Sequence, residues 1–221
     1  MHRIRLPRWA VERGAPLNRF DGLEPRTALV VIDMQTAFVA EDQVFGNAHA
    51  RDIVPAVNVL AHAFRAAGRP VIWTRQTQAA DGPGAPAPWQ YDPADPFVAR
   101  ALAALAPGSE GHALHPLMEV GGQDTVVDKH RYGAFSCPVG ALRRTLEAQA
   151  VGMLVICGTL TNVCCESTAR EAYMAGYKTL VVADAMAAVT DAEHNAALMN
   201  LRLNFADVRR TAEVIRMLGR T

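Results

Sequence analysis

Two adjacent cysteines, Cys164 and Cys165, lie just after an apolar run and at the start of a helical pattern. A thiol in the first turn of a helix meets backbone N–H groups without intrahelical partners and the positive end of the helix dipole, and both favour the thiolate. The same N–H groups could bind the oxyanion that forms when a thiolate attacks a carbonyl. Residues 158–170 therefore predict a cysteine nucleophile, although these features do not separate the two thiols.

Two charged residues, Asp33 and Lys129, each end an apolar run elsewhere in the chain. A carboxylate beside a thiol can accept its proton and return it to a departing nitrogen, and a nearby ammonium lowers the thiol pKa by its charge. The pattern also allows simpler roles, because an aspartate at a strand end is often a cap or ion-pair partner and a lysine there is often solvated. Asp33, Lys129 and Cys164 are thus candidates for one catalytic site.

Apolar runs and helical patterns alternate along the chain, and this order predicts how the candidates are positioned. Predicted strands fall at 28–33, 71–74, 125–129, 153–157, 179–184 and 206–210, and predicted helices at 50–67, 138–149, after Cys164, after Thr190 and at the C-terminus. This alternation predicts a three-layer, doubly wound α/β fold, in which a mainly parallel six-stranded sheet has helices on both faces. Functional groups in such sheets gather at the carboxyl ends of the strands.

The chain of 221 residues is expected to fold as one domain at 27–221, preceded by an irregular, arginine-rich arm at 1–26. Residues 76–96 form a long loop that is rich in proline and carries aromatic side chains. Such a loop is either a lid over a site or a surface excursion whose aromatic side chains cover the core. The sequence leaves both interpretations open.

The composition favours chemistry on a small molecule. The 22 Lys and Arg residues balance the 22 Asp and Glu residues, so no overall charge attracts nucleic acid or an anionic membrane, and neither is expected as a partner. The N-terminus lacks the apolar stretch of a secretory signal, and no run approaches the roughly 20 apolar residues of a membrane span. We therefore expect a cytoplasmic protein with reduced cysteines and a small-molecule substrate.

The sequence resembles the isochorismatase-like cysteine hydrolases, which include nicotinamidases, N-carbamoylsarcosine amidohydrolases and ureidoacrylate amidohydrolases. The resemblance rests on residues 28–35, on Lys129 with the stretch 131–135, and on residues 158–172, and it covers about residues 27–215. It implies that Asp33 is the general acid/base, that Lys129 is the catalytic lysine, and that Cys164 is the nucleophile. The resemblance therefore chooses between the two adjacent thiols.

The resemblance also implies a mechanism and an activity. It implies a cis peptide between Thr159 and Leu160, and an oxyanion hole formed by the backbone N–H groups of Leu160 and Cys164. It implies hydrolysis of a small amide or N-carbamoyl (ureido) bond through a thioester, with release of ammonia or an amine. The motifs look closest to the ureidoacrylate and N-carbamoyl branch, and homo-oligomers are common in the family.

Three other functions remain possible at this point. True isochorismatases of the same family hydrolyse a vinyl ether and have a small residue in place of the nucleophilic cysteine. Alternatively, Cys164 and Cys165 could form a redox-sensing pair on a scaffold without hydrolase activity. The chain could also be a non-catalytic subunit whose arginine-rich arm docks on a partner protein.

The substrate-binding residues are predicted from their closeness to the motifs. Phe38, Tyr132 and Phe135 are the aromatic candidates, and Arg75 or Arg131 could bind a substrate carboxylate in bidentate fashion. Either arginine could equally form an ordinary surface ion pair. We expect no metal and no cofactor, because residues 74–78 lack the metal ligands that nicotinamidase-like relatives have there and no glycine-rich phosphate motif is present.

Overall fold

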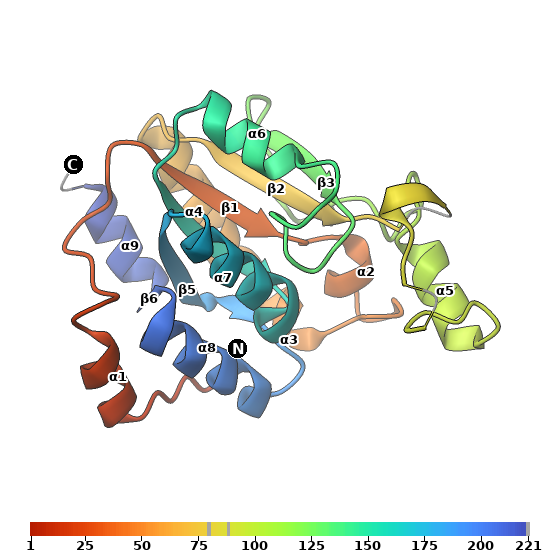
Figure 1. Cartoon of the computed structure of the whole chain (residues 1–221), viewed down its shortest axis with the longest axis horizontal. Helices are drawn as coiled ribbons and strands as arrows, with labels where there is room; N and C mark the ends of the chain where they lie inside the picture. Colours follow the sequence, from red (N-terminus) through yellow and green to blue (C-terminus); the bar gives the residue numbers. More distant parts are fainter. Residues whose placement is uncertain (79–80, 88, 220–221) are drawn as a thin grey trace.

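A computed structural model describes residues 1–78, 81–87 and 89–219. In these residues six parallel strands form one sheet in the order β3-β2-β1-β4-β5-β6 (Figure 1). The strands are β1 (Thr27–Ile32), β2 (Val71–Gln76), β3 (Thr125–Lys129), β4 (Met153–Thr159), β5 (Lys178–Ala187) and β6 (Asp207–Arg209). The predicted doubly wound α/β fold is confirmed, and all of its strand pairs are parallel.

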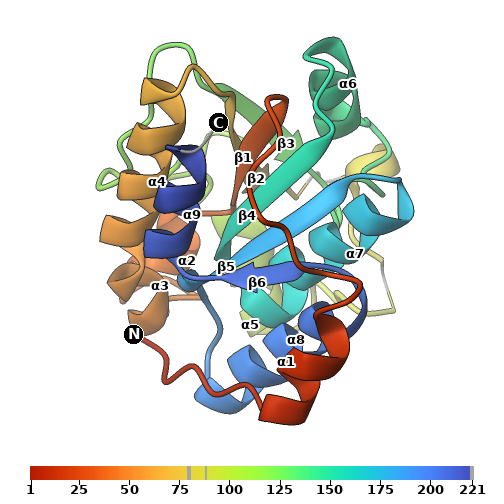
Figure 2. The ribbon, with the colours of Figure 1, turned by 90° about the vertical axis from the view of Figure 1, so that its left-hand side faces the viewer.

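Helices cover both faces of this sheet (Figure 2). The helical segments are α1 (Arg8–Gly14), α2 (Thr36–Val39), α3 (Ala48–Asp52), α4 (Val54–Ala66), η1 (Gly82–Gly84), α5 (Pro96–Ala104), α6 (Ala141–Ala148), η2 (Thr161–Cys165), α7 (Glu166–Met174), α8 (Asp191–Asn204) and α9 (Thr211–Leu218). Helices α3, α4 and α9 pack on one face, and α6, α7 and α8 pack on the other. Among the described residues, no helix combines the length and apolar character needed to cross a membrane.

Strand β1 shows why the central strands read as continuous apolar runs. Its alternate residues face opposite layers of helices: Leu29 and Val31 pack with α4, whereas Val30 and Ile32 pack with α6 and α7. Every residue of β1 is buried, as expected for a central strand of a parallel sheet covered on both faces.

The strand order reverses between β1 and β4, which lie side by side at the centre of the sheet. The chain leaves β1 toward β2 and β3, and after β4 it continues on the other side to β5 and β6. The crevice outside the carboxyl ends of such a central strand pair is the usual binding site of an open α/β sheet. Gly158 of β4 allows β1 and β4 to approach each other closely at this end, because only glycine leaves room for the Ile32 carbonyl oxygen. An added Cβ would lie 2.1 Å from that oxygen, and the φ of Gly158 is 110°.

Three local predictions need correction. Residues 1–26 are not wholly irregular, because they contain α1, which packs against α8 (Figure 2). Helix α6 begins at Ala141 after the N-cap Gly140, so Pro138 precedes the helix instead of opening it. Helix α5 was not predicted; Asp95 caps it by accepting hydrogen bonds from the backbone N–H groups of Phe97 and Val98.

Candidate active site

Asp33 and Lys129 form a buried ion pair at the carboxyl edge of the sheet. The distance from Lys129 Nζ to Asp33 Oδ2 is 2.8 Å, and the two side chains are 1% and 0% exposed. Asp33 directly follows β1 and has φ 47°, whereas Lys129 is the last residue of β3. Burial opposes the charge of Lys129, but the neighbouring Asp33 and Cys164 outweigh it, so the pKa of Lys129 is raised and the ammonium is retained.

Strand β2 lies between β1 and β3 and supplies two polar partners for the ion pair. Thr74 Oγ1 donates to Asp33 Oδ1 at 2.7 Å, and Lys129 Nζ donates to Gln76 Oε1 at 2.6 Å. Lys129 Nζ also donates to the Arg131 carbonyl oxygen at 3.1 Å. Thr74 and Gln76 were not among the predicted site residues, although two polar residues with a spacing of two in an apolar strand were an available signal.

Cys164 lies in the π-helical turn η2 and not in the first turn of a regular α-helix. The peptide bond between Thr159 and Leu160, which precedes this turn, is cis, as the family resemblance implied. The Cys164 thiol interacts with both Asp33 and Lys129, so the structure brings the three predicted residues together. Because all three are candidates for catalysis, we refer to Asp33, Lys129 and Cys164 as the catalytic cluster.

The resting state of Cys164 differs from the thiolate expected from a helix start. Burial raises the pKa of the Cys164 thiol to about 12; Lys129 opposes this rise, and Asp33 adds to it. The thiol is therefore protonated at neutral pH and lies beside a carboxylate that can accept its proton. This arrangement suits deprotonation during attack on a carbonyl.

The two adjacent thiols have different surroundings. Cys164 lines a cavity, whereas Cys165 is fully buried among the apolar side chains between the sheet and the helices. Burial raises the pKa of Cys165 well above its usual value. All four cysteines of the chain are free.

A cavity of about 330 Å³ opens in front of Cys164. Two of the predicted substrate-binding residues, Phe38 and Tyr132, line it together with Leu160. Gln78, Gln90 and Tyr91 from the proline-rich loop also line it, so the described part of this loop borders the site. The rest of that predicted loop includes residues 79, 80 and 88, which lie outside the described residues.

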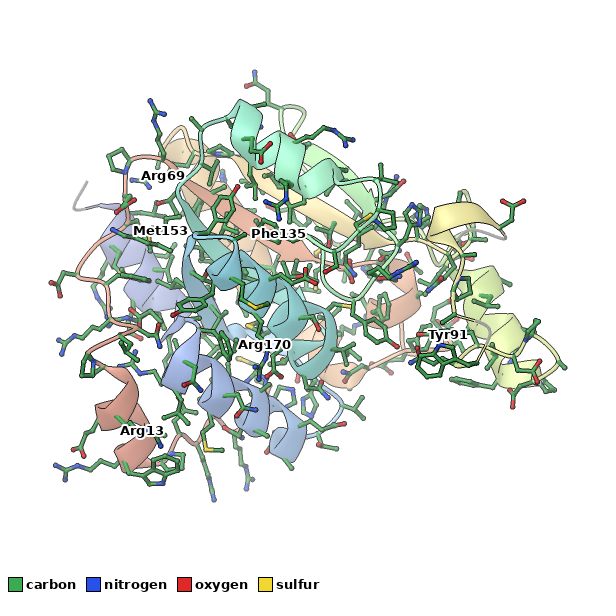
Figure 3. The ribbon with its side chains drawn as sticks, viewed as in Figure 1. Arg13, Arg69, Tyr91, Phe135, Met153 and Arg170 are labelled. Carbon is green, nitrogen blue, oxygen red and sulfur yellow. The ribbon has the colours of Figure 1, made fainter. Side chains whose placement is uncertain are left out.

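The other two predicted substrate-binding residues do not line this cavity. Arg75 forms an ion pair with Asp128 on the neighbouring strand, with Nε and Oδ1 2.7 Å apart. The Phe135 ring packs against Tyr177, with the Arg143 guanidinium over its face. Figure 3 places Phe135 near the middle of the molecule, whereas Tyr91 lies at the end that carries α5. We therefore leave Arg75 and Phe135 out of the proposed substrate site.

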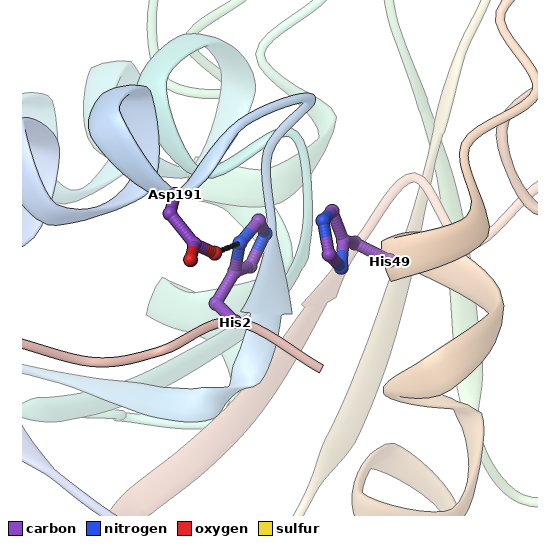
Figure 4. Close-up of side chains that lie close together, drawn as sticks. All are labelled: His2, His49 and Asp191. Atoms are coloured by element: carbon purple, nitrogen blue, oxygen red, sulfur yellow. Dashed lines mark hydrogen bonds and ion pairs between the residues drawn. The ribbon is translucent and has the colours of Figure 1, made fainter.

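A second group of titratable side chains, one buried and three half-buried, joins the N-terminal arm to the domain (Figure 4). The ring of His2 lies against His49 and stacks on His194, with centroids 3.9 and 4.2 Å away, and its Nδ1 pairs with Asp191 Oδ1 at 2.8 Å. His194 Nδ1 is 2.8 Å from the hydroxyl of Thr161, the first residue of the η2 turn. We call His2, His49, His194 and Asp191 the histidine cluster.

Among the described residues, His2, His49 and Asp191 are the one group of three such side chains close enough to share a metal ion. His2 does not need an ion to satisfy its nitrogens. Its Nδ1 bonds to Asp191, and its Nε2 accepts a hydrogen bond from the backbone N–H of Ala188 at 3.0 Å. This bonding fits a neutral imidazole, so the group is well explained as a structural contact of the arm.

An acid, a cation and a thiol that gather at the carboxyl edge of a doubly wound sheet define an α/β protein with a hydrolase-type site. The Isochorismatase domain family matches residues 27–213. The chain therefore belongs to the isochorismatase-like family of hydrolases.

Individual relatives agree with this assignment. A cysteine hydrolase structure from Pseudomonas syringae pv. phaseolicola superposes with a TM-score of 0.82 at 30% identity, covering 93% of this chain and 98% of that one. The ureidoacrylate amidohydrolase RutB of Methylobacterium radiotolerans is 33% identical over 89% of this chain and 81% of its own. Nicotinamidase 3 of Arabidopsis thaliana is 40% identical, but over only 40% of this chain and 43% of its own.

Proposed function

We propose that the protein is a cysteine-dependent amidohydrolase that cleaves a small amide or N-carbamoyl bond through a thioester. One observation carries this proposal: Cys164 faces a cavity of about 330 Å³ and interacts with the buried pair of Asp33 and Lys129. A cavity of this volume suits a small molecule. The relatives whose names describe amide hydrolysis support the same class of reaction.

In the first half of the reaction, the Asp33 carboxylate takes the proton of the Cys164 thiol as the sulfur attacks the carbonyl carbon. The backbone N–H groups of Leu160 and Cys164 stabilise the resulting oxyanion. The C–N bond then breaks, and Asp33 gives its proton to the departing nitrogen. Ammonia or an amine leaves, and the acyl group remains on sulfur as a thioester.

In the second half, water attacks the thioester carbonyl while Asp33 takes one of its protons. The C–S bond breaks, the acid product leaves, and the proton on Asp33 returns to Cys164. Lys129 remains charged throughout, because its raised pKa keeps the ammonium at working pH. The charge of Lys129 lowers the free energy needed to form the Cys164 thiolate. Its hydrogen bond to Gln76 and its ion pair with Asp33 hold the Asp33 carboxylate in place.

The test is ammonia release from a panel of primary amides and N-carbamoyl compounds by wild type and by Cys164→Ala. We expect turnover by wild type and a loss of roughly a thousandfold or more in kcat for the variant, because the thioester cannot form. The matched control is Cys165→Ala, which removes the neighbouring thiol from the core and should keep most of the activity.

Two results would contradict the proposal in different ways. Turnover by Cys164→Ala together with an inactive Cys165→Ala would move the nucleophile to the neighbouring residue. If wild type released no ammonia or amine from any compound in the panel, the proposal of an amidohydrolase activity would be wrong.

A further inference from the structure

The cavity in front of Cys164 has a wall of apolar side chains. One part of this wall comes from Phe38 and Phe45, whose rings stack with centroids 5.4 Å apart. Helix α5 and its C-cap supply the adjoining part with Phe97, Leu102 and Leu105, and the Phe97 ring meets Phe45 edge-on with centroids 6.2 Å apart. Apolar surface of this kind binds hydrocarbon groups by removing them from water.

The polar part of the lining carries no net charge. It consists of the carboxamides of Gln76, Gln78 and Gln90 and the hydroxyls of Tyr91 and Tyr132. Burial and the hydrogen bond to Tyr132 raise the pKa of Tyr91, so its hydroxyl stays neutral. Among the described lining residues there is no Arg, Lys, His, Asp or Glu. A substrate carboxylate bound there would lose its hydration without gaining an ionic partner.

A cationic side chain, Arg131, lines a second cavity, which shares part of its lining with the first. This cavity has a volume of about 450 Å³, and its lining includes His130 and Arg131. Tyr91 and Tyr132 line both cavities, and their hydroxyls are 2.6 Å apart. Gln76, Gln78 and Gln90 also line both cavities, so these shared polar residues lie between the space that contains the thiol and the space that contains the arginine.

We propose, resting on the amidohydrolase function above, that the substrate is a primary carboxamide of an uncharged, apolar acid. The amide would lie at Cys164 among the glutamine carboxamides, and the aliphatic or aromatic acyl chain would lie against α5. Hydrolysis of R–CO–NH₂ with one water gives ammonia and the carboxylate R–COO⁻.

The experiment compares two amides of equal chain length that differ in charge at the far end. Hexanamide ends in a methyl group, whereas the monoamide of adipic acid ends in a carboxylate. We expect kcat/KM for ammonia release to be at least about 100-fold higher for hexanamide, because burial of an unpaired carboxylate is unfavourable. A preference for the adipic monoamide would overturn the inference and leave the amidohydrolase function standing.

Two arginine variants of α5 test whether this helix faces the acyl chain. Phe97→Arg places a cation at the cavity wall, and Phe97 is half exposed, so the change should not disturb the core. It should raise the preference for the anionic amide by about tenfold, because it supplies an ionic partner. Ala99→Arg is the matched control, since Ala99 is exposed on the same helix but does not line the cavity. Equal selectivity in both variants would overturn the assignment of α5 as the acyl wall.

A binding measurement keeps the inference testable without turnover. Iodoacetamide alkylates accessible thiols, and fragment ions in tandem mass spectrometry locate the label on Cys164 and not on the adjacent Cys165. Hexanamide should slow alkylation of Cys164 at concentrations at which the adipic monoamide does not. Protection by the anionic amide alone, or by neither amide, would overturn the proposed substrate class even if the protein hydrolysed no amide.

Discussion

Two groups of titratable side chains contact the η2 turn, and burial affects their charges in opposite ways. In the catalytic cluster, the buried Lys129 and Asp33 compensate each other at 2.8 Å. In the histidine cluster, burial lowers the pKa of His194 to about 3, and burial also lowers the pKa of His2. The first group is thus a buried ion pair beside a thiol, whereas the second contains a buried, neutral His194 where the arm meets the domain.

The two clusters are therefore sensitive to different changes. A compensated pair fails when one partner is removed, because the other charge remains buried alone. A buried neutral imidazole such as that of His194 destabilises the fold when acid protonates it, because the new charge is removed from water. The catalytic cluster should therefore respond most strongly to mutation, and the histidine cluster to pH.

The largest expected effect is that of Lys129→Met, which removes the ammonium and keeps an unbranched side chain. The Asp33 carboxylate would remain buried without its partner, so we expect the free energy of unfolding to fall by about 3–5 kcal/mol. Ammonia release should be lost as well. Urea denaturation measures the first effect, and the amide panel measures the second.

The double variant Asp33→Asn, Lys129→Met separates charge from packing. Asparagine tolerates the positive φ of this position, and the pair then carries no charge. We expect the double variant to regain much of the lost stability while remaining inactive. A double variant that is less stable than Lys129→Met alone would contradict the description of this pair as a compensated charge.

Much of the sheet could be predicted from the sequence, because buried parallel strands are continuous apolar runs. The predicted strand at 125–129 has the same bounds as β3. Helices α1 and α5 were missed, because α1 lies between prolines and α5 follows a proline-rich loop. For α5 a local signal existed, since Asp95 followed by Pro96 is a favourable helix start.

The catalytic cluster was predictable for a different reason from the cavity. Asp33, Lys129 and Cys164 lie at or just beyond strand ends, and strand ends of a parallel sheet converge at one edge whatever the loops do. The path of the loop that carries Tyr91 cannot be derived from its composition. Closeness in sequence does not by itself place a residue in the site, as Arg75 shows. Arg75 lies between Thr74 and Gln76 on β2, but its side chain points to the opposite face of the sheet and pairs with Asp128.

A change in pH should have an effect of intermediate size on the free energy of unfolding, through His194 of the histidine cluster. His194 has a folded pKa of about 3, below the usual value of 6.5, so the unfolded chain binds a proton first as pH falls. The stability from neutral His194 is therefore full above about pH 6.5 and is lost as pH falls toward 3. Between pH 7.5 and 4.5, the stability advantage of wild type over His194→Gln should shrink by roughly 1–3 kcal/mol.

Free energies of unfolding from denaturant titrations at both pH values measure this change. His62→Gln is the control, because His62 is exposed on α4, and a change with pH that is absent from this variant assigns the effect to His194. Parallel pH profiles for wild type and His194→Gln would mean that His194 is not held neutral by the fold.

The smallest expected effect is that of His2→Ala, which removes the arm's contribution to the histidine cluster. The variant loses hydrogen bonds to Asp191 and Ala188 and the stacking on His194, so we expect a loss of about 1–2 kcal/mol relative to His62→Ala. Because the cluster is a structural contact, kcat/KM for the best amide should stay within about twofold. A fall in kcat at unchanged stability would contradict this contrast between the clusters, since it would connect His2, through His194 and Thr161, to the turn that carries Cys164.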